Sequence, residues 1–153
     1  HLGDVTINIA AAWSGTALTI DASSLDQNAL STNNEILTLA QVTTDTAVIT
    51  VTSGAGADII TTGASGDTIT TNAGIDTISS NGGADIISAG GGNDIIDAGA
   101  GRDSIDAGAG NDTITISTDT DFEVSGGTET VDGGAGVDTL NLTAASPSPT
   151  IAI

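Results

Sequence analysis

Carboxylate side chains recur at a fixed interval through the middle of this chain, and such an interval can serve a metal ion or an acid–base pair. Seven aspartates follow one another nine residues apart, and an isoleucine lies two residues after each of them. A column of cation ligands explains this pattern far better than a pair of glycosidase carboxylates. The aspartates are Asp58, Asp67, Asp76, Asp85, Asp94, Asp103 and Asp112.

Glycine or asparagine lies four residues before each aspartate, and glycine usually lies two residues before it. Both residue types tolerate positive φ, so this part of each unit predicts a tight turn with carbonyl groups available as ligands. Ser65, Asn72 and Asn81 replace glycine, and we expect weaker binding at those turns. The candidate backbone ligands are Gly54, Gly56, Gly63, Gly74, Gly83, Gly90, Gly92, Gly99, Gly101, Gly108 and Gly110.

The elements that position these groups follow from the same period. Each unit predicts a turn and then a short strand whose isoleucine points inward while its neighbours point outward. Two units make one 18-residue coil with a strand on each side, so every second aspartate falls in the same column. We therefore predict an all-β fold, a right-handed parallel β-solenoid or β-roll. One column holds Asp58, Asp76, Asp94 and Asp112, and the other holds Asp67, Asp85 and Asp103.

Stacking these carboxylates has an electrostatic cost that points to a metal ion. Stacked strands lie about 4.8 Å apart, and two carboxylates at that spacing repel by roughly 3–4 kcal/mol at an effective dielectric near 20. Burying one isoleucine contributes only about 1.5–3 kcal/mol. A divalent cation between stacked pairs removes the repulsion. The ligands are hard oxygens, without cysteine, which suits Ca²⁺ better than octahedral Mg²⁺.

The repeat resembles the RTX nonapeptide, whose consensus is G-G-x-G-x-D-x-U-x, most closely at residues 90–96 and 108–114. The resemblance implies a calcium β-roll in a secreted bacterial protein. RTX repeats are typical of type I secretion substrates that stay unfolded in low cytosolic calcium and fold outside the cell. The stacked pairs within the two columns predict about five bound Ca²⁺ ions or more.

The flanking sequence extends the pattern on both sides. We divide the chain into metal-free β coils (1–50), the RTX calcium β-roll (51–115), interrupted final coils (116–145), and a linker with the start of a following strand (146–153). Residues 5–9, 17–20, 36–39 and 48–51 alternate apolar and polar side chains, which predicts wider coils of the same solenoid. A separate small β-sandwich in this region is the alternative.

After the repeat the phase slips and then returns. Asp119, Asp121 and Glu123 crowd a polar stretch that is more typical of a solvated loop than of a site. Glu129 lies 17 residues after Asp112, which suggests a coil one residue short of 18 with a loop bulging out. Asp138 is a plausible further calcium ligand, and Glu129 is a weaker one.

Composition excludes several classes of function. The chain carries 20 acidic residues and a single basic one, Arg102, for a formal net charge of −19. Nucleic acid and anionic membrane surfaces both need a positive protein surface and are implausible partners. No apolar stretch is long enough to span a membrane. The lone His1 is an unlikely base, so we predict no enzyme activity.

The leading functional interpretation is an extracellular structural protein that folds and assembles in Ca²⁺. Its Thr-, Ala-, Gly- and Ser-rich composition resembles that of RTX-bearing bacterial surface-layer proteins. We expect self-association into a polymer or lattice at the cell surface, where a glycan is a candidate partner. The alternative is a secretion and folding module of an enzyme, toxin or adhesin. Ice binding is disfavoured because alanine or glycine fills the position three before each aspartate.

Overall fold

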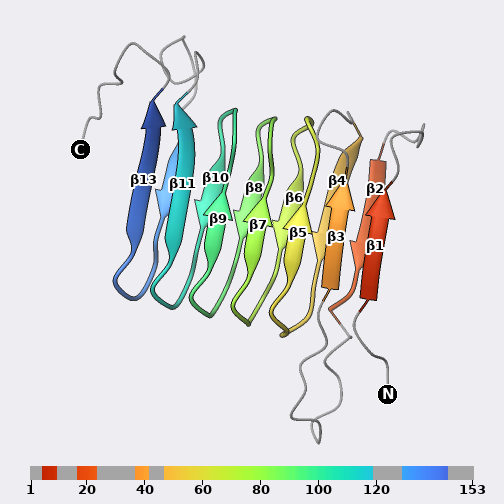
Figure 1. Cartoon of the computed structure of the whole chain (residues 1–153), viewed down its shortest axis with the longest axis horizontal. Helices are drawn as coiled ribbons and strands as arrows, with labels where there is room; N and C mark the ends of the chain where they lie inside the picture. The colour runs from red at the N-terminus through yellow and green to blue at the C-terminus, as the bar shows by residue number, and fades with distance from the viewer. Residues whose placement is uncertain (1–4, 10–16, 24–36, 42–46, 119–128, 145–153) are drawn as a thin grey trace, which may run out of the picture.

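A computed structural model describes residues 5–9, 17–23, 37–41, 47–118 and 129–144. Short strands alternate between two parallel sheets, so the chain winds as a flattened coil along one axis (Figure 1). One sheet has seven strands, namely β1 (Val5–Ile9), β3 (Leu37–Gln41), β5 (Ile59–Thr61), β7 (Thr77–Ser79), β9 (Ile95–Asp97), β11 (Thr113–Thr118) and β13 (Thr139–Ala144). The other has six, namely β2 (Ala17–Asp21), β4 (Val48–Thr52), β6 (Thr68–Thr70), β8 (Ile86–Ser88), β10 (Ser104–Asp106) and β12 (Thr130–Asp132).

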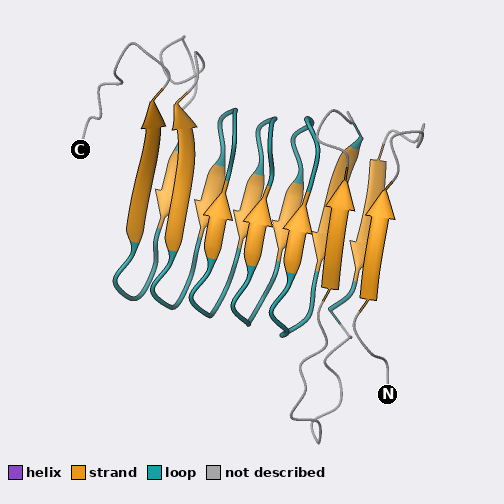
Figure 2. Cartoon of the chain, in the orientation of Figure 1, coloured by secondary structure: helices purple, strands orange, loops and turns teal. Residues whose placement is uncertain are grey.

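The predicted β-roll is therefore confirmed, with one strand for each nine-residue unit. Within the repeat, paired residues are 18 positions apart, as in the pairing of Ile60 with Ile78 and of Ile69 with Ile87. Turns join the strands at both edges of the coil (Figure 2). Each strand is three residues long over most of the repeat because the glycine-rich turn occupies the rest of the unit.

The core is a row of isoleucines between the two sheets. The seven isoleucines of the repeat are at most 2% exposed. Ile49, Val51 and Ile116 extend the row, and small residues line the turn ends. One aliphatic side chain per half coil fills this narrow interior, which explains how the chain builds a core with so few aromatic residues. The seven are Ile60, Ile69, Ile78, Ile87, Ile96, Ile105 and Ile114.

The strands before the repeat lie in the same two sheets. β1 pairs with β3, β3 with β5, β2 with β4 and β4 with β6, all in parallel. The coils are wider here, since Val5 pairs with Leu37 and Ala17 with Val48, 32 and 31 positions on. Their connecting segments fall outside the described residues, as does residue 36 of the predicted third strand.

The structure corrects our interpretation of the interruption after β11. Ser104 pairs with Thr130, and Thr113 with Thr139, both 26 positions on, which is eight more than a regular coil. Eight residues are thus inserted in one half coil, and Glu129 lies over Asp103 rather than over Asp112. The acidic residues at 119, 121 and 123 belong to a segment outside the described residues, and so does the predicted linker at 146–153.

Candidate calcium sites

The seven repeat aspartates are buried in two columns, as the spacing predicts. Each is at most 1% exposed and lies at the end of a turn, directly before a strand. Stacked partners are 18 residues apart, and they belong to consecutive coils. Burial removes these carboxylates from water, and stacking brings like charges close together. Both effects cost free energy that the fold has to offset.

A hydrogen bond that the sequence did not predict links successive aspartates within each column. The backbone N–H of Asp58 donates to Oδ1 of Asp76 at 2.8 Å, and that of Asp76 donates to Oδ1 of Asp94 at 2.8 Å. The second column repeats the arrangement, where Asp67 N donates to Asp85 Oδ1 at 2.7 Å. One carboxylate oxygen of each pair is therefore already used by the backbone.

The two columns continue beyond the seven aspartates. Asp112 N–H donates to Oδ1 of Asp138, and Asp103 N–H donates to Oε2 of Glu129, both at 3.0 Å. The longer glutamate side chain thus takes the same place as an aspartate. One column contains four stacked acid pairs and the other three, so the structure offers seven pairs where the seven repeat aspartates alone give five.

Burial disfavours the charged form of these carboxylates. It raises the pKa of Asp76 to about 6 and that of Asp85 to about 7, while hydrogen bonds from the neighbouring backbone partly offset the shift. Burial likewise raises the pKa of Asp94, and the nearby carboxylate of Asp112 adds to the rise. Groups of this kind gain most from a cation placed against them, because it restores the stability of the charged form.

The second carboxylate oxygen has the environment that a metal ligand requires. Oδ2 of Asp76, Asp85, Asp94 and Asp112 is buried and has no hydrogen-bond partner. An unsatisfied buried acceptor of a charged group costs free energy, and it is rarely left so without an ion or water. These oxygens are therefore candidate metal ligands that the hydrogen-bond network leaves available.

Turn carbonyls converge on the same space. A Cβ atom added to Gly92 would collide with the carbonyl oxygen of Gly74 and would come within 3.2 Å of Asp94 Oδ1. Gly92 has a φ of 149°, so only glycine suits both the conformation and the space. Gly74, Gly101 and Gly110 lie against the equivalent carbonyl of the previous coil in the same way.

The candidate carbonyl ligands differ in how they are used. Carbonyls four residues before aspartate accept backbone hydrogen bonds between coils, as Gly90 O does from Ala109 N–H at 2.7 Å and Gly63 O from Gly82 N–H at 3.1 Å. Carbonyls two residues before aspartate, such as that of Gly74, also face the next coil, but Gly74 O accepts no backbone hydrogen bond within the described residues. This second group is the better candidate for metal ligation.

The turns at Asn72 and Asn81 keep the glycine backbone by other means. Their φ angles are 67° and 64°, which asparagine tolerates better than most residues. Each side-chain amide donates at 2.6 Å to a carbonyl of the preceding coil, Asn72 to Ser53 and Asn81 to Thr62. These substitutions therefore preserve the turn and add a contact between coils.

A second group that the sequence analysis missed lies five residues before aspartate. Ser53, Thr62, Thr71 and Ser80 are fully buried, and each hydroxyl donates to the backbone carbonyl 18 residues on, at 2.8–3.3 Å. Their nine-residue spacing was the signal that could have identified them. In the later units alanine fills this position, at Ala89, Ala98 and Ala107.

The donor set as a whole fits calcium. In the described part of the chain, no group of three or more His, Cys, Asp or Glu side chains could hold a metal ion. Each ion would therefore need turn carbonyls as ligands in addition to the carboxylates of a stacked pair. An all-oxygen shell that mixes carboxylates and carbonyls in a flexible turn suits Ca²⁺.

The fold and the donor set together define a calcium-binding β-roll. A family model described as the RTX calcium-binding nonapeptide repeat, in four copies, matches residues 50–78, 79–114 and 124–142. These matches cover more than half of the chain, and the protein belongs to the RTX calcium-binding nonapeptide repeat family. The search of curated proteins gave no match, and the search of solved structures gave none.

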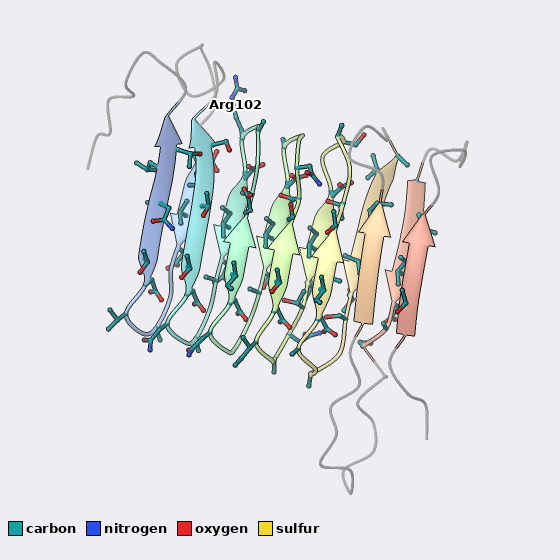
Figure 3. All side chains as sticks on the ribbon, in the orientation of Figure 1. Arg102 is labelled. Carbon is teal, nitrogen blue, oxygen red and sulfur yellow. The ribbon has the colours of Figure 1, made fainter. Side chains whose placement is uncertain are left out.

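Features outside the columns add little chemistry. Arg102 is exposed, and its side chain projects from a turn beyond the end of the sheets (Figure 3). No described helix is long and apolar enough to cross a membrane. His1 lies outside the described residues.

Proposed function

We propose that this chain is a calcium-dependent segment of an extracellular structural protein, and that it folds and assembles when Ca²⁺ fills the two acid columns. RTX repeats are typical of secreted bacterial proteins, and this supports the location. The observation that carries the proposal is the continuity of the sheets. Both run from the wider coils before the repeat through the calcium coils, so metal binding would fix the whole rod.

The ends of the sheets support assembly. Within the described residues, β1, β2, β12 and β13 each pair with one neighbouring strand only. An edge strand of this kind presents unpaired backbone groups to which a further strand can add. Leu140 at the β13 end is 50% exposed although it pairs with the buried Ile114, so a following coil would cover it. The acid columns serve calcium in this proposal, and no catalytic role is needed.

Light scattering and electron microscopy test the assembly. The purified chain is examined in millimolar Ca²⁺, in equal Mg²⁺ and in chelator. We expect particles or fibres in Ca²⁺ alone, because Mg²⁺ fits the mixed, irregular oxygen shell poorly. A chain that folds in Ca²⁺ but stays monomeric at every concentration contradicts the structural role.

That last outcome favours a second candidate, a folding and secretion module. The buried carboxylates support it, because Asp76, Asp85 and Asp94 all have raised pKa values in the folded coil without metal. A chain with this penalty stays unfolded where calcium is scarce and folds where it is abundant. Any enzyme or toxin activity would then belong to sequence attached to this module.

A further inference from the structure

Asn81 is followed by Gly82, and this is the one Asn–Gly pair in the sequence. Asparagine before glycine is chemically labile because glycine has no side chain to hinder the approach of its backbone nitrogen to the side-chain amide of the asparagine. The Gly82 nitrogen forms a bond to Cγ of Asn81, and the bond from Cγ to Nδ2 breaks. The amide nitrogen leaves as ammonia with the proton from Gly82. Water then opens the cyclic imide, so that residue 81 becomes aspartate or isoaspartate.

The folded coil holds both reacting groups. The leaving amide nitrogen of Asn81 donates to Thr62 O at 2.6 Å, and the attacking Gly82 N–H donates to Gly63 O at 3.1 Å. The carbonyl of Asn81 in turn accepts from Ala100 N–H at 2.6 Å. Coils on both sides thus fix the residue, and the ring closure requires these hydrogen bonds to break.

Asn72 provides a matched comparison within the same chain. Its φ is 67° against 64° for Asn81, and its amide donates to Ser53 O at the same 2.6 Å. Its carbonyl accepts from Gly91 N–H at 2.7 Å. The difference is the next residue, which is Ala73 rather than glycine.

We propose that Asn81 and Gly82 form a modification site that calcium controls: water deamidates Asn81 in the calcium-free chain, and the folded coil prevents it. The control by calcium rests on the calcium-driven folding proposed above. The reaction also makes refolding difficult. A carboxylate at position 81 cannot donate to Thr62 O, and isoaspartate adds a backbone atom to a coil whose register allows 18 residues. The fraction of chains deamidated at Asn81 would therefore increase with the time that the protein spends without calcium.

Peptide mass spectrometry tests the proposal on the full chain after incubation at mildly alkaline pH in Ca²⁺, in chelator, and in urea. We expect deamidation of Asn81, detected as a mass gain, to be at least about tenfold faster in chelator and in urea than in Ca²⁺, because the folded coil must open before the ring can close. A factor of ten in rate corresponds to about 1.4 kcal/mol of opening free energy. Asn72 should remain unmodified in all three samples.

The variant Gly82→Ala is the control. A Cβ at this position would meet Ala100 O at 3.7 Å and Ala64 Cα at 3.8 Å, which are ordinary contacts, and alanine fills the equivalent position at residues 55, 64, 73, 100 and 109. The variant should fold normally in Ca²⁺ and lose the rapid reaction at Asn81 in chelator and in urea.

The three samples separate two kinds of failure. Intact Asn81 in urea, or equal rates in Ca²⁺ and in urea, overturns the modification site. Circular dichroism of the chelated sample reports on folding independently. If that sample stays folded with Asn81 intact while the urea sample reacts, the modification chemistry holds and calcium-driven folding is the part that fails.

Discussion

The repeat contains two regions that share their aspartates and isoleucines but differ in how their turns are joined. In the hydroxyl coils, residues 53–88, serine or threonine lies five residues before each aspartate, and two turns carry asparagine. In the glycine coils, residues 89–115, alanine and glycine fill those positions. The hydroxyl coils therefore donate six side-chain hydrogen bonds between coils that need no metal. Four of these bonds end within residues 53–88, and those of Thr71 and Ser80 end on Ala89 and Ala98 of the glycine coils.

This difference teaches that the calcium ligands and the cross-links between coils are separate devices. A net contribution of about 1 kcal/mol for each buried hydrogen bond gives the hydroxyl coils a metal-independent share of their stability. The glycine coils, which are closer to the RTX consensus, depend more on the ions. We expect the two regions to respond differently to loss of calcium.

Removal of calcium should have the largest effect. Chelation should abolish most of the β-sheet circular dichroism signal, because stacked carboxylates repel by roughly 3–4 kcal/mol per pair without an ion. In a calcium titration followed by hydrogen exchange and mass spectrometry, the hydroxyl coils should keep their protection to lower calcium than the glycine coils. Loss of protection at the same calcium concentration in both regions would show that the side-chain hydrogen bonds between coils do not set the calcium dependence.

Asp94→Ala should have the next largest effect. Asp94 lies within a column, where its carboxylate accepts from Asp76 N–H and its own N–H donates to Asp112. Its loss affects two stacked pairs and should cost about 2–4 kcal/mol of stability in Ca²⁺, which a denaturant titration measures. The control is Asp138→Ala, since the exposed Asp138 contributes to one described pair. Equal costs for the two variants contradict the stacked arrangement.

Acid should partly replace calcium. The folded-state pKa values of Asp76 and Asp85 are about 6 and about 7, above the ordinary value of 3.8. A raised folded-state pKa favours folding fully below the unfolded value, and this contribution is lost as the pH rises through the folded value. In chelator, β-sheet signal should therefore increase as the pH falls from 7 toward 4. A calcium-free chain that loses structure over this range would contradict the burial of these carboxylates.

Exchanging the cross-links between regions should have the smallest effect. Thr71 Oγ1 donates to Ala89 O at 3.0 Å, so Thr71→Val should destabilise the hydroxyl coils by about 1–2 kcal/mol. Ala89 occupies the equivalent position in the glycine coils, where Ala89→Ser places a hydroxyl toward the coil of Ala107. Calcium midpoints from circular dichroism should rise for the first variant and fall for the second. A fall in the calcium midpoint of both variants would mean that side-chain volume, rather than the hydrogen bond, determines the stability of these coils.

The sequence predicted the fold and the acid columns well because both depend on the period alone. Isoleucines nine residues apart must alternate between sheets, and Asp58 and Asp76 must stack. The hydrogen bond from one aspartate N–H to the next carboxylate was not predictable in this way. A period fixes which residues share a column, but it does not fix which backbone group each side chain meets.

The position of Glu129 shows a second limit. A separation of 17 residues fits a coil that is one residue short and equally fits a half coil with eight residues inserted. The pairing of Ile105 with Val131 decides between them, since it places Val131 in the sheet opposite to that of Ile114. The count of ions similarly stays a prediction, because stacked pairs give the number of places and not their occupancy.

The hydrogen bonds along each column all run in one sense, from the backbone N–H of an earlier coil to the carboxylate of a later one. The two ends of the rod are consequently unlike. Within the columns, shortening the rod from the C-terminal side removes a carboxylate acceptor and leaves a buried backbone N–H without its partner. Shortening it from the N-terminal side removes the N–H donor instead, and the carboxylate oxygen that remains can bind water. Tandem copies joined end to end should therefore lengthen the rod in a head-to-tail order, and a head-to-head junction should fail.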